Sequence, residues 1–329
     1  MTDLASTLQS FFTDHLIGNR QASRHTIAAY RDALKLLLTF AHARTRTPPS
    51  RLTLTDLDAP LISAFLAHLE HDRGNSVRTR NARLSAIHAL FGYAAPRHPE
   101  HAAIIARVLA IPPKRFTQTL VTFLSDAEVD ALLAAPDRST WTGRRDHAML
   151  ALAIETGLRV SELVALTCAN AHLGVGAHIS CLGKGRKQRI TPLTTGTVTL
   201  LKSWLRERAG TPTDPVFSTR RGRPLSVDAV QRRLAKHITT ATSACPTLSE
   251  KTISPHTLRH TAAMRLLAAG VDITVIALWL GHENIASTQI YIHADLALKE
   301  RALAFTRPTT SQPGRYRPPD AVLAFLEGM

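Results

Sequence analysis

The sequence predicts a mainly α-helical protein of two domains, with one small β-hairpin or sheet in the second. Three observations support this class. Apolar residues recur at helical spacing through the first 110 residues, and a polar stretch with two prolines, "IPPKRFTQTL", then interrupts the pattern. Further along, two short alternating runs flank a Gly-Lys-Gly turn in "AHISCLGKGRKQRITPL", which is typical of a hairpin.

The N-terminal domain is expected to be entirely helical. One helix begins at Ser23, a good N-cap residue, and repeats apolar residues from Ile27 onward. Two more amphipathic stretches follow, "TDLDAPLISAFLAHLEHDRG", which ends at Gly74, and "NSVRTRNARLSAIHALFGYAA". We assign residues 1–111 to this domain and residues 112–120 to an interdomain linker.

The second domain is assigned to residues 121–308. It opens with a capping box, in which Ser125 and Glu128 satisfy backbone N–H groups at the start of a helix. Helical patterns return in "RRDHAMLALAIETG" and at about 195–208 and 226–241. Residues 309–329 begin with the linker-like "TTSQPGRYRPPD" and form a C-terminal tail.

The net charge points to a polyanionic partner. The chain carries 40 Lys and Arg residues against 25 Asp and Glu residues, a net charge of +15. Residues 1–112 hold 13 basic and 8 acidic residues and the remainder 27 and 17, so both domains share the excess. Nucleic acid is the commonest partner of such a chain, and a merely basic protein without one is the alternative.

Membrane and secreted classes are disfavoured. No apolar run reaches membrane-spanning length, and the N-terminus lacks the basic and apolar regions of a secretory signal. Cys168, Cys181 and Cys245 are widely spaced and odd in number, which indicates neither a disulfide framework nor a zinc site. We therefore expect a cytoplasmic protein with no membrane partner, and the charge favours its association with nucleic acid.

The stretch "SPHTLRH" places three cation-forming side chains on one helix face. His256, Arg259 and His260 have i, i+3 and i+4 spacing, close to a helix start at Ser254 where the backbone dipole favours an anion. The two histidines have the spacing of a zinc motif. Thr257 stands where that motif has its glutamate, however, and Arg259 would repel a cation, so we expect no metal and no cofactor.

Phosphate chemistry fits these residues better. Arginine and imidazole donate hydrogen bonds to non-bridging phosphate oxygens, and a phosphodiester transition state carries extra negative charge there. Arg159 in "ETGLRVSEL", Lys184 at the hairpin tip and His282 in "WLGHEN" offer more donors, and Tyr291 offers a nucleophile. Each alone has an ordinary explanation as a helix cap, a solvated turn or a packing residue. Their combination indicates a phosphoryl-transfer site.

Three stretches together resemble the tyrosine recombinase (phage integrase) superfamily, nearest its bacterial Xer-type and transposon integrase branches. They are "TGLRVSELVALT", "GKGRKQRITPL" and "HTLRHTAAMRLLAAGVDITVIALWLGHENIASTQIYIHAD". Six positions match the catalytic residues of this family in order and spacing: Arg159, Lys184, His256, Arg259, His282 and Tyr291. The N-terminal helices also resemble its core-binding (SAM-like) domain, so the likeness covers residues 10–305.

The resemblance implies a site-specific DNA recombinase that needs neither metal nor ATP. Tyr291 would attack a backbone phosphate, giving a 3′-phosphotyrosyl link and a free 5′-hydroxyl. Arg159 and Arg259 would bind the non-bridging oxygens, and Lys184 would protonate the leaving oxygen. The remaining roles implied are proton transfer or phosphate binding for His256 and His282, and support from a second layer for Glu162 and His260.

The resemblance also implies the partners. The family exchanges strands pairwise within a homotetramer on two double-stranded DNA sites, through a Holliday junction, often for a mobile element. A two-domain clamp would hold the DNA, and the C-terminal helix, with Leu296, Leu303 and Phe305, would dock on a neighbouring subunit. Expected phosphate or base contacts are Arg24, Arg78, Arg80, Arg83, Lys187, Arg189, Arg220, Arg221, Arg232 and Arg233.

Two alternatives stay open from the sequence. A type IB topoisomerase uses the same residues to relax supercoiled DNA as a monomer, although the Xer-like spacing argues against it. A non-catalytic DNA-binding accessory protein of the same fold is the other, although the complete set of six residues argues against lost activity.

Overall fold

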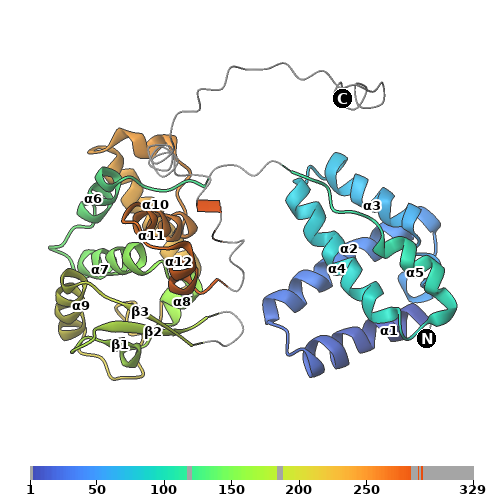
Figure 1. Cartoon of the computed structure of the whole chain (residues 1–329), viewed down its shortest axis with the longest axis horizontal. Helices are drawn as coiled ribbons and strands as arrows, with labels where there is room; N and C mark the ends of the chain where they lie inside the picture. Colours follow the sequence, from blue (N-terminus) through green and yellow to red (C-terminus); the bar gives the residue numbers. More distant parts are fainter. Residues whose placement is uncertain (1–2, 117–120, 184–187, 283–287, 289, 292–329) are drawn as a thin grey trace, which may run out of the picture. The chain divides into compact units, whose positions relative to one another are not determined.

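The computed structural model describes residues 3–116, 121–183, 188–282, 288 and 290–291. The chain divides into two compact units, residues 1–118 and 119–329, and each is described by itself (Figure 1). The predicted class is confirmed, because the described residues are mostly helical with one small antiparallel sheet. None of the described helices is long and apolar enough to cross a membrane.

Unit 1 is a helical bundle. Its core joins all of its main helices and includes Phe11, Leu37, Phe65 and Phe91, which are at most 1% exposed. The predicted N-cap is confirmed, since the Ser23 hydroxyl accepts a hydrogen bond from the backbone N–H of Thr26. The elements are α1 (Asp3–Ser10), a π-helical segment (Phe11–Asn19), α2 (Arg24–Thr45), α3 (Ala59–His71), α4 (Val77–Ala94) and α5 (Ala102–Leu109).

The first residues of the expected linker are bound to unit 1. Asn81 on α4 donates from its side-chain amide to the Lys114 carbonyl at 2.8 Å, and its carbonyl accepts from the Lys114 backbone N–H at 3.1 Å. The Lys114 ammonium pairs with Glu70 on α3 at 2.5 Å. Residues 112–114 are therefore packed as part of unit 1.

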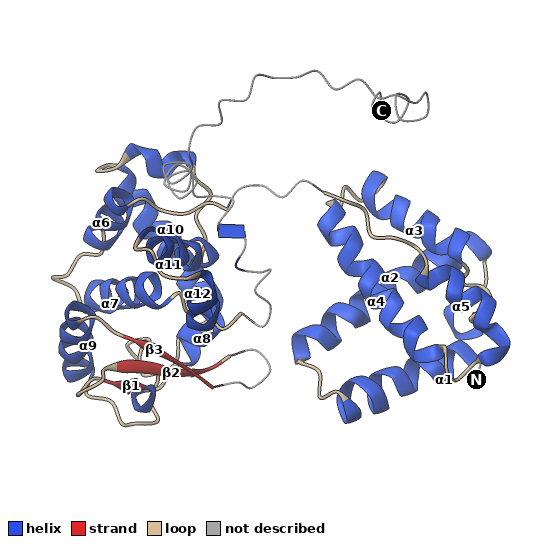
Figure 2. Cartoon of the chain, viewed as in Figure 1, coloured by secondary structure: helices blue, strands red, loops and turns tan. Residues whose placement is uncertain are grey.

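In unit 2, α7 packs against α6, α9 and α11, and the sheet lies at one end of the unit (Figure 2). The capping box at Ser125 and Glu128 is confirmed. The predicted hairpin is confirmed too, with Cys181 opposite Arg189, and a short third strand that the sequence did not indicate pairs beside it. The elements are α6 (Asp126–Ala134), α7 (Trp141–Thr156), α8 (Val160–Ala165), β1 (Ala171–His172), β2 (His178–Leu182), β3 (Gln188–Pro192), α9 (Thr195–Arg208), α10 (Val227–Thr242), α11 (Pro255–Ala268) and α12 (Ile273–Leu280).

Two glycines end helices where the backbone turns left-handed. Gly157 ends α7 with φ 61°, and Gly281 ends α12 with φ 63°. A Cβ at Gly157 would lie 2.6 Å from the Leu280 side chain, so this position also allows α12 to pack closely against the break between α7 and α8. The two helix ends are thereby brought together, and the site described below is built on them.

A buried charge cluster ties α7 to α10, and its removal gives a first prediction. Asp146 accepts hydrogen bonds from Arg145, Arg233 and His237 at 2.6–3.1 Å, with its own side chain 3% exposed. Asp146→Asn leaves the buried Arg145 without a counter-charge, and we expect unit 2 to lose about 3 kcal/mol of unfolding free energy in urea titrations.

The matched control is Asp130→Asn at an exposed position of α6, which should stay within about 0.5 kcal/mol of the wild type. A loss below about 1 kcal/mol for Asp146→Asn would contradict the assigned role of the cluster.

Candidate active site

The carboxylate of Glu162 joins two arginines from different elements. Its Oε1 accepts from the guanidinium of Arg159 at 2.8 Å, and its Oε2 accepts from the Arg159 backbone N–H at 2.8 Å. The same Oε2 accepts from Nη2 of Arg189, on β3, at 2.8 Å. The Glu162 side chain is only 5% exposed, so little water competes for its oxygens. The charged hydrogen bonds therefore fix the positions of both guanidiniums.

Backbone carbonyls hold the third arginine. Arg259, on α11, is 2% exposed and donates to the Gly157 carbonyl at 2.7 Å and to the Leu280 carbonyl at 2.6 Å. Arg159 donates to the next carbonyl, that of Gly281, at 3.1 Å. These acceptors lie at the C-terminal ends of α7 and α12, where the helix dipole is negative. The two helix ends therefore bind the two arginines that the sequence assigned to the phosphate.

The site carries more positive charge than its one carboxylate balances. Burial, followed by the positive charges of Arg159 and Arg189, lowers the pKa of Arg259 to about 10. Nε and Nη1 of Arg189 are buried without a hydrogen-bond partner among the described residues. Unsatisfied buried donors of this kind are costly unless an anion meets them. The arrangement is suited to an oxyanion.

Tyr291 is packed against α11 and α12 beside these arginines. It is 1% exposed and lies in a small apolar cluster with Met264, Ile276 and Leu280. Its hydroxyl is 3.0 Å from Nδ1 of His260. The sequence assigned His260 only a supporting role, and the structure instead places it in contact with the hydroxyl oxygen.

The other two histidines surround the tyrosine differently. The ring of His282 is nearly parallel to that of Tyr291, with centroids 6.5 Å apart, and its Nδ1 is 2.7 Å from the Thr288 hydroxyl. The ring of His256 meets that of His260 edge to face, with centroids 4.6 Å apart. All three predicted histidines thus lie in one group with Tyr291.

The protonation of this group follows from burial and from the arginines. Burial raises the pKa of Tyr291 to about 12, although Arg259 and Arg159 act in the opposite direction. Burial, followed by neighbouring positive charges, lowers the pKa of His260 and of His282 to about 4. At neutral pH the site therefore holds a protonated phenol and neutral imidazoles.

The expected DNA contacts differ in exposure. Arg24, Arg78, Arg220, Arg221 and Arg232 are exposed, as a DNA contact requires. Lys187 lies outside the described residues, as do the expected acid Lys184 and the expected docking residues Leu296, Leu303 and Phe305. Arg83 and Arg233 are partly buried; Arg83 donates to the Ala29 carbonyl and Arg233 pairs with Asp146.

Two of the expected DNA contacts require correction. Arg80 is 6% exposed and donates to the Pro112 carbonyl and to Asn81, inside unit 1. Arg189 is 8% exposed and is bound to Glu162. Neither reaches the surface as a free cation. Alternation along β3 predicts the opposite, because Arg189 and Thr191 face inward while the apolar Ile190 between them is 60% exposed.

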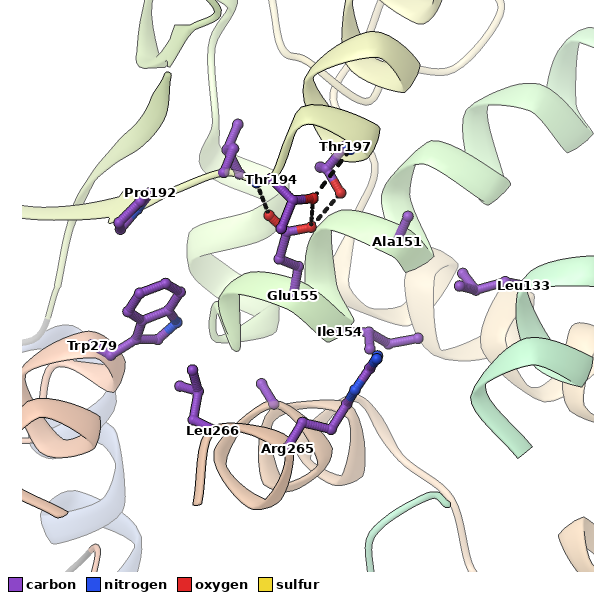
Figure 3. A pocket seen from close by; sticks show the side chains of 12 residues that line it. Leu133, Ala151, Ile154, Glu155, Pro192, Thr194, Thr197, Arg265, Leu266 and Trp279 are labelled. Atoms are coloured by element: carbon purple, nitrogen blue, oxygen red, sulfur yellow. Dashed lines mark hydrogen bonds between the residues drawn. The ribbon is translucent and has the colours of Figure 1, made fainter. Parts of the chain in front are cut away.

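A groove of about 500 Å³ lies elsewhere on unit 2 and contains none of the predicted site residues. Pro192, Leu266 and Trp279 form part of its apolar wall (Figure 3). Glu155 also lines the groove and accepts hydrogen bonds from the backbone N–H and hydroxyl of Thr194 and from the hydroxyl of Thr197. Within the described part of the chain, no cluster of three or more His, Cys, Asp or Glu side chains has the form of a metal site.

Comparison with known proteins agrees with this geometry. The model of the phage integrase family matches residues 122–297, and that of the phage integrase N-terminal SAM-like domain matches residues 10–98. The chain belongs to the phage integrase family. It is a tyrosine-type site-specific DNA recombinase, and its relatives include the Xer recombinases.

Individual relatives cover most of the chain. A Sinorhizobium fredii protein named integrase/recombinase y4rC is 55% identical over 99% of this chain and 98% of its own length. Tyrosine recombinase XerC of Xanthomonas campestris is 34% identical over 86% and 83%. Among solved structures, the XerH recombinase bound to its difH substrate aligns with a TM-score of 0.70 at 24% identity, over 87% of this chain and 81% of that one, which shows a shared fold.

The position of Gly281 gives a prediction for the recombinase. A Cβ there would lie 3.2 Å from Cδ and Nη1 of Arg189, on top of the strain of a left-handed backbone. We expect Gly281→Ala to displace Arg189 from Glu162 and to slow formation of the covalent protein–DNA adduct at least about tenfold.

Gly270→Ala is the matched control for this substitution. Gly270 also has a positive φ, 82°, just beyond a helix end, but nothing lies within 4 Å of its added Cβ. Both variants should lose about 1 kcal/mol of unfolding free energy, and the control should cleave DNA normally. Equal cleavage by the two variants would contradict the role given to Arg189 and Glu162.

Proposed function

We propose that Tyr291 is the nucleophile that cleaves DNA, with Arg159 and Arg259 binding the non-bridging oxygens of the attacked phosphate. The observation that carries this proposal is the excess of buried positive charge next to a buried phenol. Both arginines act on the pKa of Tyr291, so they lie near enough to stabilise charge that develops on its oxygen. Preorganised cations of this kind stabilise a phosphoryl-transfer transition state more than the ground state.

The proposed reaction consumes no cofactor or cosubstrate. Attack by the tyrosine oxygen forms a 3′-phosphotyrosyl bond and releases a 5′-hydroxyl, and attack by a 5′-hydroxyl from a partner strand reverses the step. Because the phosphoryl bond is kept in the covalent link, the reaction requires neither ATP nor a metal ion. We assign protonation of the leaving 5′-oxygen to Lys184, and contacts to the phosphate oxygens to His256 and His282.

Double-stranded DNA with specific recombination sites is the proposed partner. The XerH structure and that of the Tn1549 transposon integrase, which aligns with a TM-score of 0.68 at 17% identity, were both solved with their DNA. Exposed arginines of both units, such as Arg78 and Arg232, supply the phosphate contacts. We further propose strand exchange within a homotetramer on paired sites, through a Holliday junction, in the service of a mobile element.

Covalent trapping tests this proposal. Nicked duplexes that carry sites from the ends of the host element, incubated in EDTA, should form a denaturation-resistant adduct with the wild type and none with Tyr291→Phe. Tyr93→Phe, at a buried tyrosine of unit 1, is the matched control and should form the adduct. Specific binding of DNA without an adduct on any verified site would contradict the proposal.

The role of Lys184 has its own test. We expect Lys184→Ala to slow cleavage about 100-fold or more on normal DNA, because the leaving oxygen then lacks its acid. A 5′-bridging phosphorothiolate has a sulfur leaving group that needs no protonation, so this substrate should restore cleavage to near the wild-type rate. Equal defects on both substrates would exclude Lys184 as the acid.

A further inference from the structure

The Tyr291 hydroxyl has one hydrogen-bond partner among the described residues, and this is His260. The two atoms, Nδ1 of His260 and Oη of Tyr291, are 3.0 Å apart, and the rings meet at 64°. In the neutral tautomer that carries its proton on Nε2, Nδ1 of His260 accepts a hydrogen bond from the phenol O–H at such a distance. His260 is therefore in place to receive the proton that leaves Tyr291 when its oxygen attacks phosphorus.

The other two histidines are not placed for this transfer. His282 has its Nδ1 at the hydroxyl of Thr288 and presents the face of its ring to the ring of Tyr291. His256 lies one helical turn before His260, and its ring contacts the His260 ring rather than the tyrosine oxygen. The positions of these residues on α11 therefore suit different roles. His256 and Arg259 are available to the phosphate, and His260 contacts the phenol.

We propose that His260 is the general base of DNA cleavage and the general acid of religation. This role rests on Tyr291 being the nucleophile. In cleavage, the O–H bond of Tyr291 breaks and its proton moves to Nδ1 of His260, while the Oη–P bond forms and the bond from phosphorus to the 5′-oxygen breaks. The 5′-oxygen leaves with a proton from the separate acid. In religation each transfer runs backward, and His260 returns its proton to the phenol.

The charges around His260 set the timing of this transfer. Burial, followed by His256 and Arg259 on α11, opposes a positive charge on the His260 ring. With pKa values of about 12 for the phenol and about 4 for the imidazole, the proton does not move in advance of attack. It moves as the Oη–P bond forms, because bonding to phosphorus acidifies the phenol and the arriving phosphodiester brings negative charge to the arginines.

Single-turnover adduct formation on the nicked duplex tests the proposal with two variants. His260→Asn keeps a side-chain oxygen close to the position of Nδ1, so it preserves an acceptor for the tyrosine but not a base. We expect it to form the adduct at least about 100-fold more slowly than the wild type. We expect His260→Ala to be equally slow and to be accelerated by added imidazole, more strongly by the more basic substituted imidazoles.

Controls separate this role from folding and from the proposed function. His147→Asn changes a buried histidine of α7 whose Nδ1 is 2.8 Å from the Leu133 carbonyl, and it should show neither the slow adduct formation nor the rescue. DNA binding and thermal unfolding of each variant confirm that it is folded. Wild-type protein that forms an adduct lost in Tyr291→Phe establishes the nucleophile independently of His260.

Either of two results would overturn the base role. One is cleavage by His260→Asn within about twofold of the wild type, which would reduce His260 to a group that positions Tyr291. The other is a folded, DNA-binding His260→Ala that imidazole does not accelerate. Absence of any adduct with the wild type would instead remove the proposed nucleophile, and the base role with it.

Discussion

The site depends on the way one carboxylate and three backbone carbonyls hold three arginines together. Glu162 binds Arg159 and Arg189, while the carbonyls of Gly157, Leu280 and Gly281 accept from Arg159 and Arg259. The like charges of these guanidiniums repel, and burial removes the water that would screen them. Carbonyls at helix ends offset part of this cost. The phosphate that we propose to bind here would offset the remainder.

The same positive field determines the state of the reacting groups. Burial, and after it the neighbouring positive charges, lower the pKa of His260 and of His282, so both imidazoles stay neutral. Burial keeps the phenol protonated in spite of the arginines. If Tyr291 is the nucleophile, as we propose, it stays inactive until a phosphodiester binds beside it and favours a proton on the imidazole that accepts it. We infer that DNA binding, rather than a metal or a nucleotide, supplies the negative charge that this cluster of arginines, histidines and Tyr291 needs in order to react.

Much of this arrangement was predictable from local patterns. Periodicity, Ser23 and the capping box at Ser125 predicted helices, and the spacing in "SPHTLRH" correctly placed its residues on one helix. Helix spacing could not show which histidine meets Tyr291, because that contact joins residues 31 positions apart and depends on how the segment after α12 packs.

The burial of Arg80 and Arg189 was likewise missed. A basic residue is expected at the surface unless a partner is known, and their partners come from other elements. The contacts of Arg159 and Arg259 with backbone carbonyls could not be predicted from the sequence for the same reason. Backbone acceptors carry no signature in the residue type, and only the close approach of two helix ends brings them to Arg259.

Peptide mapping of the trapped adduct tests the central claim most directly, namely that the arginine cluster serves Tyr291. After nuclease digestion and trypsin, Tyr291 falls in the peptide of residues 266–299, in which it is the one tyrosine. The account predicts that mass spectrometry finds a nucleotide joined through its 3′-phosphate to Tyr291 in this peptide. A nucleotide attached to any other residue, or through a 5′-phosphate, would contradict it.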